Sequence, residues 1–318
     1  RWVASGSLDH SVRVWDVTDG KLVRTLEGHK DPVYAVAISP DGRLLASAGG
    51  TALRGNVGTG DVGIRLWNLS DGRPVRRIDE NRVDVLSMSF TPDGCCLVTT
   101  GADEAVRFWD VHTAKLTRMV KSEKSRSAMV VAVSQDGRYV AAAGEDGIAR
   151  VWDYKTGARV ARLGEQDPTG ETAAAPLSSC SFDRNGTSLL VTSFNEAEIK
   201  IWNVDSRRLI RRFKGYEGSN AAALSGSGTL AVTADISSAP KLWDVTSGGV
   251  LTSLTPVVGS WAVAFSRDAQ RIAASSSDGT IYVFDCAACG PLPEIQKLGE
   301  RRIAHRLTPD ELRAILGE

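Results

Sequence analysis

The sequence predicts an all-β protein built from seven repeats of about 42 residues. An aromatic residue followed by Asp or Asn recurs at intervals of 52, 42, 43, 50, 41 and 41 residues, at Trp15, Trp67, Trp109, Trp152, Trp202, Trp243 and Phe284. Between these positions lie short apolar runs bounded by Gly, Asp and Pro, which is the pattern of buried strands. A period of this kind indicates one repeat architecture rather than a set of unrelated domains.

Three further columns keep their offset from the aromatic residue. Six positions before it stand Asp9, Asp61, Asp103, Asp146, Glu196, Ser237 and Asp278. Two positions before it a basic residue stands in every repeat but the last, at Arg13, Arg65, Arg107, Arg150, Lys200 and Lys241. Ten positions before it most repeats have Ser or Thr, and Ser47 is expected to take this role in the longer second repeat. Each repeat thus surrounds one aromatic ring with a fixed set of polar groups.

These columns resemble the WD-repeat family over about residues 2–286. The resemblance implies a seven-bladed β-propeller of four-stranded antiparallel blades, with strands a to d running outward from the axis. The repeat signatures end near residues 16, 68, 110, 153, 203, 244 and 285. We expect one propeller domain, residues 1–290, and a short C-terminal helical tail, residues 291–318. With this tail the chain is similar to the C-terminal propeller of bacterial multidomain signalling proteins, in which an NTPase or kinase precedes the propeller.

The first and last repeats are expected to be incomplete. The first supplies strands b, c and d, and the last supplies a, b and c at roughly Ser260–Ser266, Arg271–Ser276 and Thr280–Asp285. The two remaining strands would be consecutive in sequence, directly upstream of Arg1. Because the sequence has no initiator Met, we expect a piece of a longer protein, which an upstream extension of about 25 residues would stabilise.

The resemblance implies that the acidic and aromatic columns are structural pins. In a tight b–c turn the carboxylate accepts bonds from backbone N–H groups, and the indole N–H donates to Ser or Thr. We expect the aspartates to be mostly buried, and His29, in the single Gly-His pair, to bond Asp61. The predicted pins are Asp9, Trp15, His29, Asp61, Trp67, Asp103, Trp109, Asp146, Trp152, Trp202, Trp243 and Asp278.

The basic column is interpreted as part of the repeat, with each stem along apolar surface and each charged head in solvent. Lys+Arg and Asp+Glu both number 38, so the formal net charge is zero. This balance argues against a nucleic-acid partner. No apolar run has the length of a membrane span, so no membrane partner is expected.

No catalytic or metal-binding constellation is evident. The histidines are far apart in sequence, at His10, His29, His112 and His305. Cys286-x-x-Cys289 could be half a zinc site, but no second pair exists, so a turn with two free thiols is the favoured interpretation. An odd count of five cysteines fits a reducing compartment. We therefore expect a cytoplasmic protein without cofactor or metal, and not an enzyme.

One column varies in residue type. At the second residue of strand a stand Tyr34, Leu86, Met129, Ser178, Asn220 and Trp261. The resemblance implies that this column lies near the central channel on the top face, where family members commonly contact partners; ordinary channel lining is the alternative. Two insertions, Gly49–Gly60 and Glu165–Pro176, would lie on the same face. The candidate partner-binding residues are Tyr34, Leu86, Met129, Asn220 and Trp261, and Tyr34 and Trp261 are expected to share one surface.

The function expected from the resemblance is that of a non-catalytic protein-interaction scaffold or sensor module. It would be part of a larger bacterial regulatory protein, and would bind protein partners, or an upstream domain of the same chain, on the top face and channel mouth. The alternative is a propeller enzyme, a hydrolase or lyase with a site at the channel mouth, because this fold class hosts both kinds of function.

Overall fold

The computed structural model describes residues 2–50, 60–81, 83–101, 103, 105–121, 128–164, 175–193, 198–214 and 221–286. These residues form 26 strands in seven antiparallel sheets, and the predicted fold class, an all-β seven-bladed propeller with mostly four-stranded blades, is confirmed. The expected helical tail and most of both insertions lie outside the described residues. Within the described part, no helix is long and apolar enough to cross a membrane.

The chain divides into two compact units between Val133 and Ser134. The first unit contains β1 (Trp2–Gly6), β2 (Val12–Asp16), β3 (Leu22–Leu26), β4 (Val33–Ile38), β5 (Leu44–Gly49), β6 (Ile64–Asn68), β7 (Pro74–Ile78), β8 (Val85–Phe90), β9 (Cys96–Gly101), β10 (Ala105–Asp110), β11 (Leu116–Lys121) and β12 (Ala128–Val133). The second contains β13 (Tyr139–Gly144), β14 (Ala149–Asp153), β15 (Arg159–Leu163), β16 (Leu177–Phe182), β17 (Ser188–Ser193), β18 (Glu198–Asn203), β19 (Leu209–Lys214), β20 (Ala221–Leu224), β21 (Leu230–Ala234), β22 (Lys241–Asp244), β23 (Val250–Ser253), β24 (Val263–Phe265), β25 (Arg271–Ser275) and β26 (Ile281–Asp285).

Every sheet is a meander in which strands that follow one another in sequence pair antiparallel. The four-stranded sheets are β4–β7, β8–β11, β12–β15, β16–β19 and β20–β23. As expected for the first and last repeats, β1–β3 and β24–β26 have three strands each among the described residues. The repeat period of the sequence therefore corresponds to one sheet.

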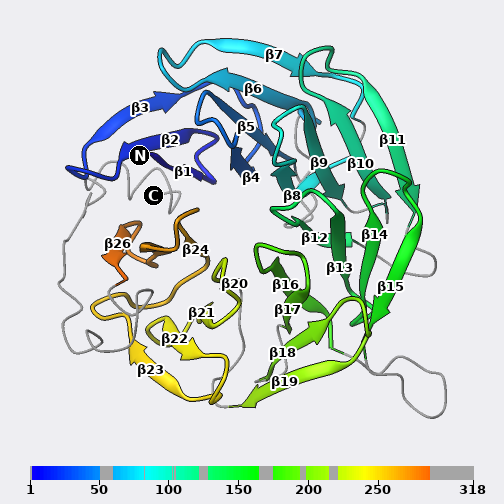
Figure 1. Ribbon diagram of the computed structural model, residues 1–318. Coiled ribbons are helices and arrows are strands. Elements are labelled where there is room, and N and C mark those ends of the chain that lie inside the picture. The colour runs from blue at the N-terminus through cyan, green and yellow to red at the C-terminus, as the bar shows by residue number, and fades with distance from the viewer. Residues whose placement is uncertain are drawn as a thin grey trace. The chain divides into compact units, whose positions relative to one another are not determined.

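Within each unit the first strands of neighbouring sheets lie side by side (Figure 1). In one unit β4 contacts β8 and β8 contacts β12, and in the other β16 contacts β20 and β20 contacts β24. Serine side chains join these strands: Ser179 Oγ accepts from the Ala222 N–H at 3.1 Å and donates to the Ala222 carbonyl at 2.9 Å. Backbone groups at the edge of one sheet are thus partly satisfied by side chains of its neighbour.

Each recurring aromatic ring that belongs to a described core cluster packs against the preceding sheet. Trp67 lies with Val12, Val14 and Leu26 of the first sheet, and Trp109 lies with residues of the second sheet. In the other unit, Trp243 packs on the fifth sheet and Phe284 on the sixth. An aromatic side chain supplies a large apolar area at one position. The repeat of the aromatic column is therefore a repeat of the contact between sheets.

The indole N–H groups do not all find the predicted partner. Trp67 Nε1 donates to Ser47 Oγ at 2.7 Å, which confirms the role expected for Ser47. Trp109 donates to Thr99 at 2.9 Å and Trp243 donates to Thr233 at 3.0 Å. In contrast, the buried Nε1 atoms of Trp15 and Trp202 have no hydrogen-bond partner in the part of the chain that the structure describes.

A hydrogen-bonded turn joins the first two strands of each sheet. In the turn before β5, Asp41 Oδ1 accepts from Ser39 Oγ and from the Arg43 N–H, and Ser39 Oγ accepts from the Leu44 N–H. Turns with the same bonds are made by residues 91–96, 134–139 and 266–271. Glycine is needed at Gly94 in the second of these turns, for example, because φ there is +72°.

Replacing Trp109 and Trp202 separately by Phe tests the indole bonds. Trp109→Phe leaves the buried Thr99 hydroxyl without its donor, so we expect it to lower the free energy of unfolding by about 1–3 kcal/mol. Trp202→Phe removes an N–H that has no partner, and should cost about 1 kcal/mol less. Urea unfolding of the two variants measures the difference. Equal losses would show that the Trp109–Thr99 bond contributes nothing.

Candidate functional site

A β-bulge occurs at the start of the first strand in three sheets. In β4 the pairing with β5 shifts between Val33 and Ala35, so Tyr34 is the extra residue of a bulge. The same shift makes Leu86 the extra residue in β8 and Ser178 the extra residue in β16. A bulge re-aims one side chain out of the regular alternation and is common next to functional sites. The variable column of the sequence therefore coincides with a backbone irregularity.

The side chains of this column differ in exposure. Tyr34 and Leu86 are half-buried on neighbouring strands of one unit, whereas Ser178 is buried, with Oγ 3.0 Å from Thr192 Oγ1. Trp261 was expected inside a strand beginning at Ser260, but β24 begins only at Val263, so Trp261 belongs to the preceding loop. Asn220 and the side chain of Met129 lie outside the described residues. The structure therefore tests this column in only four repeats.

Three large apolar side chains of the second unit stand exposed on adjoining loops. Ile236 is 53% exposed, Val258 62% and Trp261 64%. Ile236 belongs to the turn after β21, and the other two belong to the loop before β24. We call these three residues the Trp261 patch. Contiguous exposed apolar groups are unusual in a folded domain unless they contact something else.

Hydrogen bonds fix the backbone beneath the Trp261 patch. Ser260 N–H donates to the Asp235 carbonyl at 2.6 Å, and Ser277 N–H donates to the Val258 carbonyl at 3.1 Å. At Gly259 the loop lies close to the turn that contains Ile236: a Cβ atom here would lie 2.9 Å from the Ile236 carbonyl oxygen, and φ is +63°. The loop before β24 is therefore held between two neighbouring turns, and the apolar side chains project from a preformed frame.

The basic column pairs with the acidic column within each of the first four repeats. Arg13 Nη2 lies 2.7 Å from Asp9 Oδ2, Arg65 lies 3.0 Å from Asp61, Arg150 Nη1 lies 3.1 Å from Asp146, and Arg107 contacts both oxygens of Asp103. The interpretation that these heads lie in solvent is therefore wrong. The offset of four across the turn brings the guanidinium to the carboxylate, on the side of the sheet that carries the Trp.

The aspartates are less buried than expected. Asp61 is buried, Asp9 and Asp146 are half-buried, and Asp103 and Asp278 are exposed, so the prediction of general burial is wrong. The expected backbone bonds are present: Ser11, Lys30, Ile148 and Thr280 N–H groups donate to Asp9, Asp61, Asp146 and Asp278 at 2.9, 2.9, 3.3 and 2.9 Å. The turns lie at the ends of the sheets, where a charged group can keep part of its hydration.

In the fifth and sixth repeats the structure describes acidic residues outside the expected column that the sequence analysis missed. Glu196 lies outside the described residues, but Glu198 lies 3.4 Å from Lys200 and 3.6 Å from Arg212. In the sixth repeat the buried carboxylate is Asp235, which accepts from the N–H and hydroxyl of Ser237 at 2.8 Å each. The sequence did offer a signal for both residues. Glu198 stands two positions after the expected column position, and Asp235 stands two positions before it.

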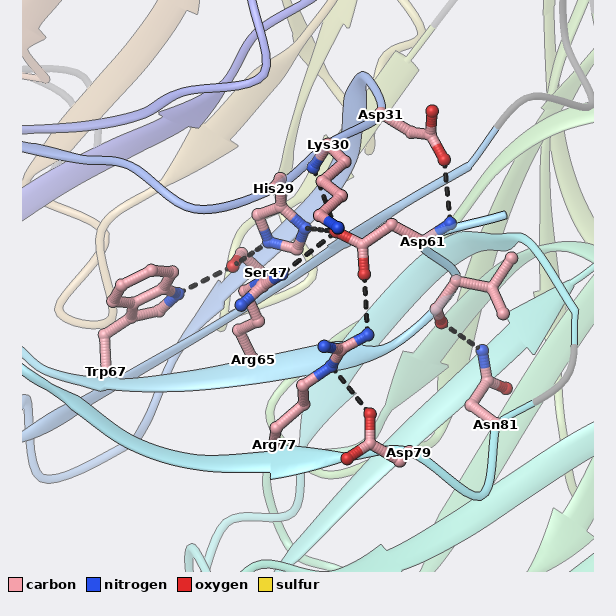
Figure 2. Close-up of polar contacts among 11 residues, drawn as sticks. His29, Lys30, Asp31, Ser47, Asp61, Arg65, Trp67, Arg77, Asp79 and Asn81 are labelled. Carbon is pink, nitrogen blue, oxygen red and sulfur yellow. Dashed lines mark hydrogen bonds and ion pairs between the residues drawn. The ribbon is translucent and has the colours of Figure 1, made fainter. Parts of the chain in front are cut away.

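The second repeat contains a network of polar contacts (Figure 2). His29 Nε2 lies 2.7 Å from Ser47 Oγ, which also accepts from the Trp67 indole. Asp61 Oδ2 accepts from the Lys30 N–H and Arg65, and Oδ1 accepts from Arg77 at 2.8 Å. Asp61 is thus bonded by one amide and two guanidinium groups, while its own N–H donates to Asp31 at 2.8 Å.

The expected hydrogen bond between His29 and Asp61 is absent. His29 Nδ1 lies 3.9 Å from Asp61 Oδ2, and this buried nitrogen has no hydrogen-bond partner among the residues that the structure describes. Burial, with Arg65 nearby, lowers the pKa of His29 to about 4, so the imidazole is neutral near pH 7. Burial alone would raise the pKa of Asp61, but the Lys30 amide and Arg65 outweigh it and the pKa is lowered. Guanidinium groups bind a carboxylate more strongly than a neutral imidazole does, which explains the arrangement.

A protein-family model described as "IFT122 first beta-propeller" matches residues 1–285. The chain belongs to this family. Its resemblance to WD-repeat propellers is thereby confirmed.

Relatives in this fold family include three plant proteins. The propeller is 24% identical over 297 residues to a "WD repeat-containing protein 26 homolog" of Arabidopsis thaliana, over 89% of this chain and 46% of the relative. It is 35% identical over 158 residues to "Small ribosomal subunit protein RACK1y" of Oryza sativa subsp. japonica, over 47% of this chain and 43% of the relative. It is 24% identical over 288 residues to a "Guanine nucleotide-binding protein subunit beta" of the same subspecies, over 84% of this chain and 72% of the relative. The chain thus spans less than half the length of the first two relatives.

The cysteines of this propeller correct one further prediction. Cys286 is buried and disulfide-bonded, so the interpretation of it as a free thiol is wrong. Cys95, Cys96 and Cys180 carry free thiols. Among the described residues, no group of three or more His, Cys, Asp or Glu side chains is placed to hold a metal ion.

Asp61→Asn tests the network, with Asp278→Asn as the matched control. The first change removes the buried charge that binds Arg65 and Arg77, and should lower the free energy of unfolding by about 3–5 kcal/mol. The second affects an exposed carboxylate and should cost less than about 1 kcal/mol. Denaturant midpoints of both variants provide the measurement. Similar losses at the two positions would contradict a special role for the second repeat.

His29 should make the stability of this propeller depend on pH. Its folded pKa lies below the ordinary value of 6.5, so the unfolded chain takes up a proton first as the pH falls below 6.5. We expect the free energy of unfolding to fall by about 2 kcal/mol through this group between about pH 7.5 and pH 5. His29→Gln should remove this part of the pH dependence. His112→Gln, at an exposed histidine, should retain it, and an unchanged slope in His29→Gln would refute the assignment.

Proposed function

We propose that this propeller is a non-catalytic protein-interaction or sensor module of a larger bacterial regulatory protein. Its partner is a protein, or another domain of the same polypeptide, that offers an apolar surface to the Trp261 patch. Nucleic acid and membranes are not part of the proposal, and neither is a cofactor. We propose a cytoplasmic location, which the thiols of Cys95, Cys96 and Cys180 favour and the disulfide at Cys286 does not.

The observation that carries this proposal is the exposure of Trp261 beside Val258 and Ile236. Tryptophan is among the residues that most often dominate the energy of protein interfaces. Here the ring projects from a hydrogen-bonded loop, so little conformational freedom would be lost on binding. The hydroxyl of the buried Ser260 donates to the Ala262 carbonyl, and the hydroxyl of the exposed Ser277 donates to the Val258 carbonyl, so both hold the backbone of this loop. The patch therefore presents apolar side chains from a backbone that is already held in place.

The bulged residues Tyr34 and Leu86 support the same function in the other unit. Both are half-buried at the start of neighbouring first strands, where the backbone irregularity sets their direction. Tyrosine contributes a rigid ring and a hydroxyl group to an interface. We propose that these residues, with the column residue Met129, contact a protein partner in this unit, and that Asn220 extends the contact of the Trp261 patch in the other unit.

The alternative of a hydrolase or lyase has less support. The carboxylates that such an enzyme would use are engaged in pairs: Asp9, Asp61, Asp103 and Asp146 each bind an arginine of their own repeat. Acid–base catalysis needs a group whose proton can be exchanged with substrate near neutral pH. The lowered pKa of His29, deep in the second repeat, does not provide one.

Trp261→Ala, Ile236→Ser and Tyr34→Ala test the proposal, with Val250→Ser as the control. Val250 is 48% exposed on β23, at the far edge of the sixth sheet. Proteins captured from the source cells by the parent chain would be identified, and the strongest binder purified. We expect its Kd, measured by calorimetry, to rise at least about 10-fold with Trp261→Ala, and to remain unchanged with Val250→Ser.

Thermal unfolding of the same variants separates binding from stability. Trp261→Ala should leave the melting temperature nearly unchanged, because the ring is largely exposed. If every variant binds the purified partner as the parent does, the interaction surface lies elsewhere. If Trp261→Ala lowers the melting temperature as much as a core substitution, Trp261 is a packing residue and the proposal fails.

A further inference from the structure

Two adjacent cysteines occupy the turn that begins β9 in the third sheet. Cys95 and Cys96 are partly exposed thiols outside any disulfide, and the Cys95 thiol lies 3.5 Å from Cys96 Sγ, to which it donates a hydrogen bond. Side chains of consecutive residues in a regular strand point to opposite faces. The two sulfurs meet here because Cys95 belongs to the turn, whereas Cys96 is the first residue of the strand. The pair has no role in the proposed protein contact.

Hydrogen bonds hold the backbone of the pair in place. Cys95 N–H donates to Asp93 Oδ1 at 3.1 Å, and the Cys95 carbonyl accepts from Val111 N–H at 2.9 Å. Cys96 N–H donates to Thr91 Oγ1 at 3.1 Å, and the Cys96 carbonyl accepts from Thr91 N–H at 2.9 Å. The two sulfurs are therefore brought together before any ligand arrives, which lowers the entropy cost of joining them to one atom.

The turn itself does not require sulfur. The same hydrogen-bonded turn carries Arg43-Leu44 in the second repeat, Arg138-Tyr139 in the fourth and Gln270-Arg271 in the seventh. The sixth repeat has Thr229-Leu230 at the equivalent positions. The repeats thus provide internal controls: polar and apolar residues of several sizes fit here, and the double cysteine is particular to the third repeat.

We propose that Cys95 and Cys96 form a dithiol site that chelates trivalent arsenic, as in arsenoxides of the type R–As=O. Two sulfurs 3.5 Å apart, each about 2.3 Å from one central atom, as in zinc thiolates, would open an angle of roughly 100° at that atom. Such an angle suits a pyramidal trivalent centre. Soft thiophilic atoms prefer sulfur ligands, so the class of ligand follows from the donor set.

The reaction balances without an oxidant or a reductant. Two arsenic–sulfur bonds form and the arsenic–oxygen bond breaks, and the oxygen leaves as water with the two thiol protons. Arsenic stays trivalent throughout. Burial and the Asp93 carboxylate raise the pKa of Cys95 to about 12, so Cys95 is present as a thiol at neutral pH. Reagents that need a thiolate should therefore react slowly with Cys95. Condensation with the arsenoxide can start from the thiols, because both thiol protons leave in the water that is formed.

Titration of the folded chain with phenylarsine oxide, read by intact mass, tests the site. We expect one adduct per chain, whose mass reflects the loss of one water. Cys95→Thr and Cys96→Leu should each abolish it, because a single thiol cannot chelate. Both variants copy residues of the sixth repeat, so they should keep the parent melting temperature. Dithiothreitol should release the adduct, and an equal thiol concentration of 2-mercaptoethanol should not.

Two further variants control for the other cysteines. Cys180→Ser removes a buried thiol, and Cys286→Ser removes a disulfide-bonded one, so both should retain the adduct. The proposal is overturned if the adduct persists in Cys95→Thr or Cys96→Leu, or if it disappears in Cys286→Ser. It is also overturned if the folded parent chain gives no adduct. None of these outcomes depends on the protein contact at the Trp261 patch.

Discussion

The packing of each recurring aromatic ring against the preceding sheet is the interaction on which this fold depends. A four-stranded meander has two faces to bury and cannot form a core alone. Trp67, Trp109, Trp243 and Phe284 each carry apolar area into the neighbouring sheet, where they meet aliphatic side chains of strands from another repeat. Stability is therefore shared between neighbours, and the repeat period of the sequence is the spacing of these contacts.

The charged pairs beside the rings follow from the same geometry. Arg13 and Arg150 are buried, where an unpaired guanidinium would be costly, and each is paired with a half-buried aspartate of its own repeat. In the second repeat one carboxylate, Asp61, is bonded by two arginines and an amide, and this leaves His29 neutral and bonded to Ser47 instead. The polar groups thus satisfy one another within a repeat, and the apolar groups join one repeat to the next.

The surfaces assigned to function are departures from the repeat. Tyr34 and Leu86 stand at bulges, the Trp261 patch stands on a loop before a strand that begins late, and Cys95-Cys96 replaces ordinary turn residues. A regular position is constrained by packing in every sheet, so a residue that differs at one position is free to serve another purpose. This reasoning supports both proposals: that the bulged residues contact a protein, and that the two cysteines bind a small thiophilic ligand.

The sequence by itself determined the number of repeats, the class of fold, the aromatic contacts and the partner of Trp67, because these follow from fixed offsets along one chain. Only the tertiary structure decided which charges meet. The offset of four between Asp9 and Arg13 was visible in the sequence, but the pairing depends on how the turn folds back, and the competition of Arg65 and Arg77 for Asp61 depends on a third strand. The shift of the pin to Asp235 and the exposure of Trp261 were decided in the same way, since burial is set by neighbouring loops that no local pattern records.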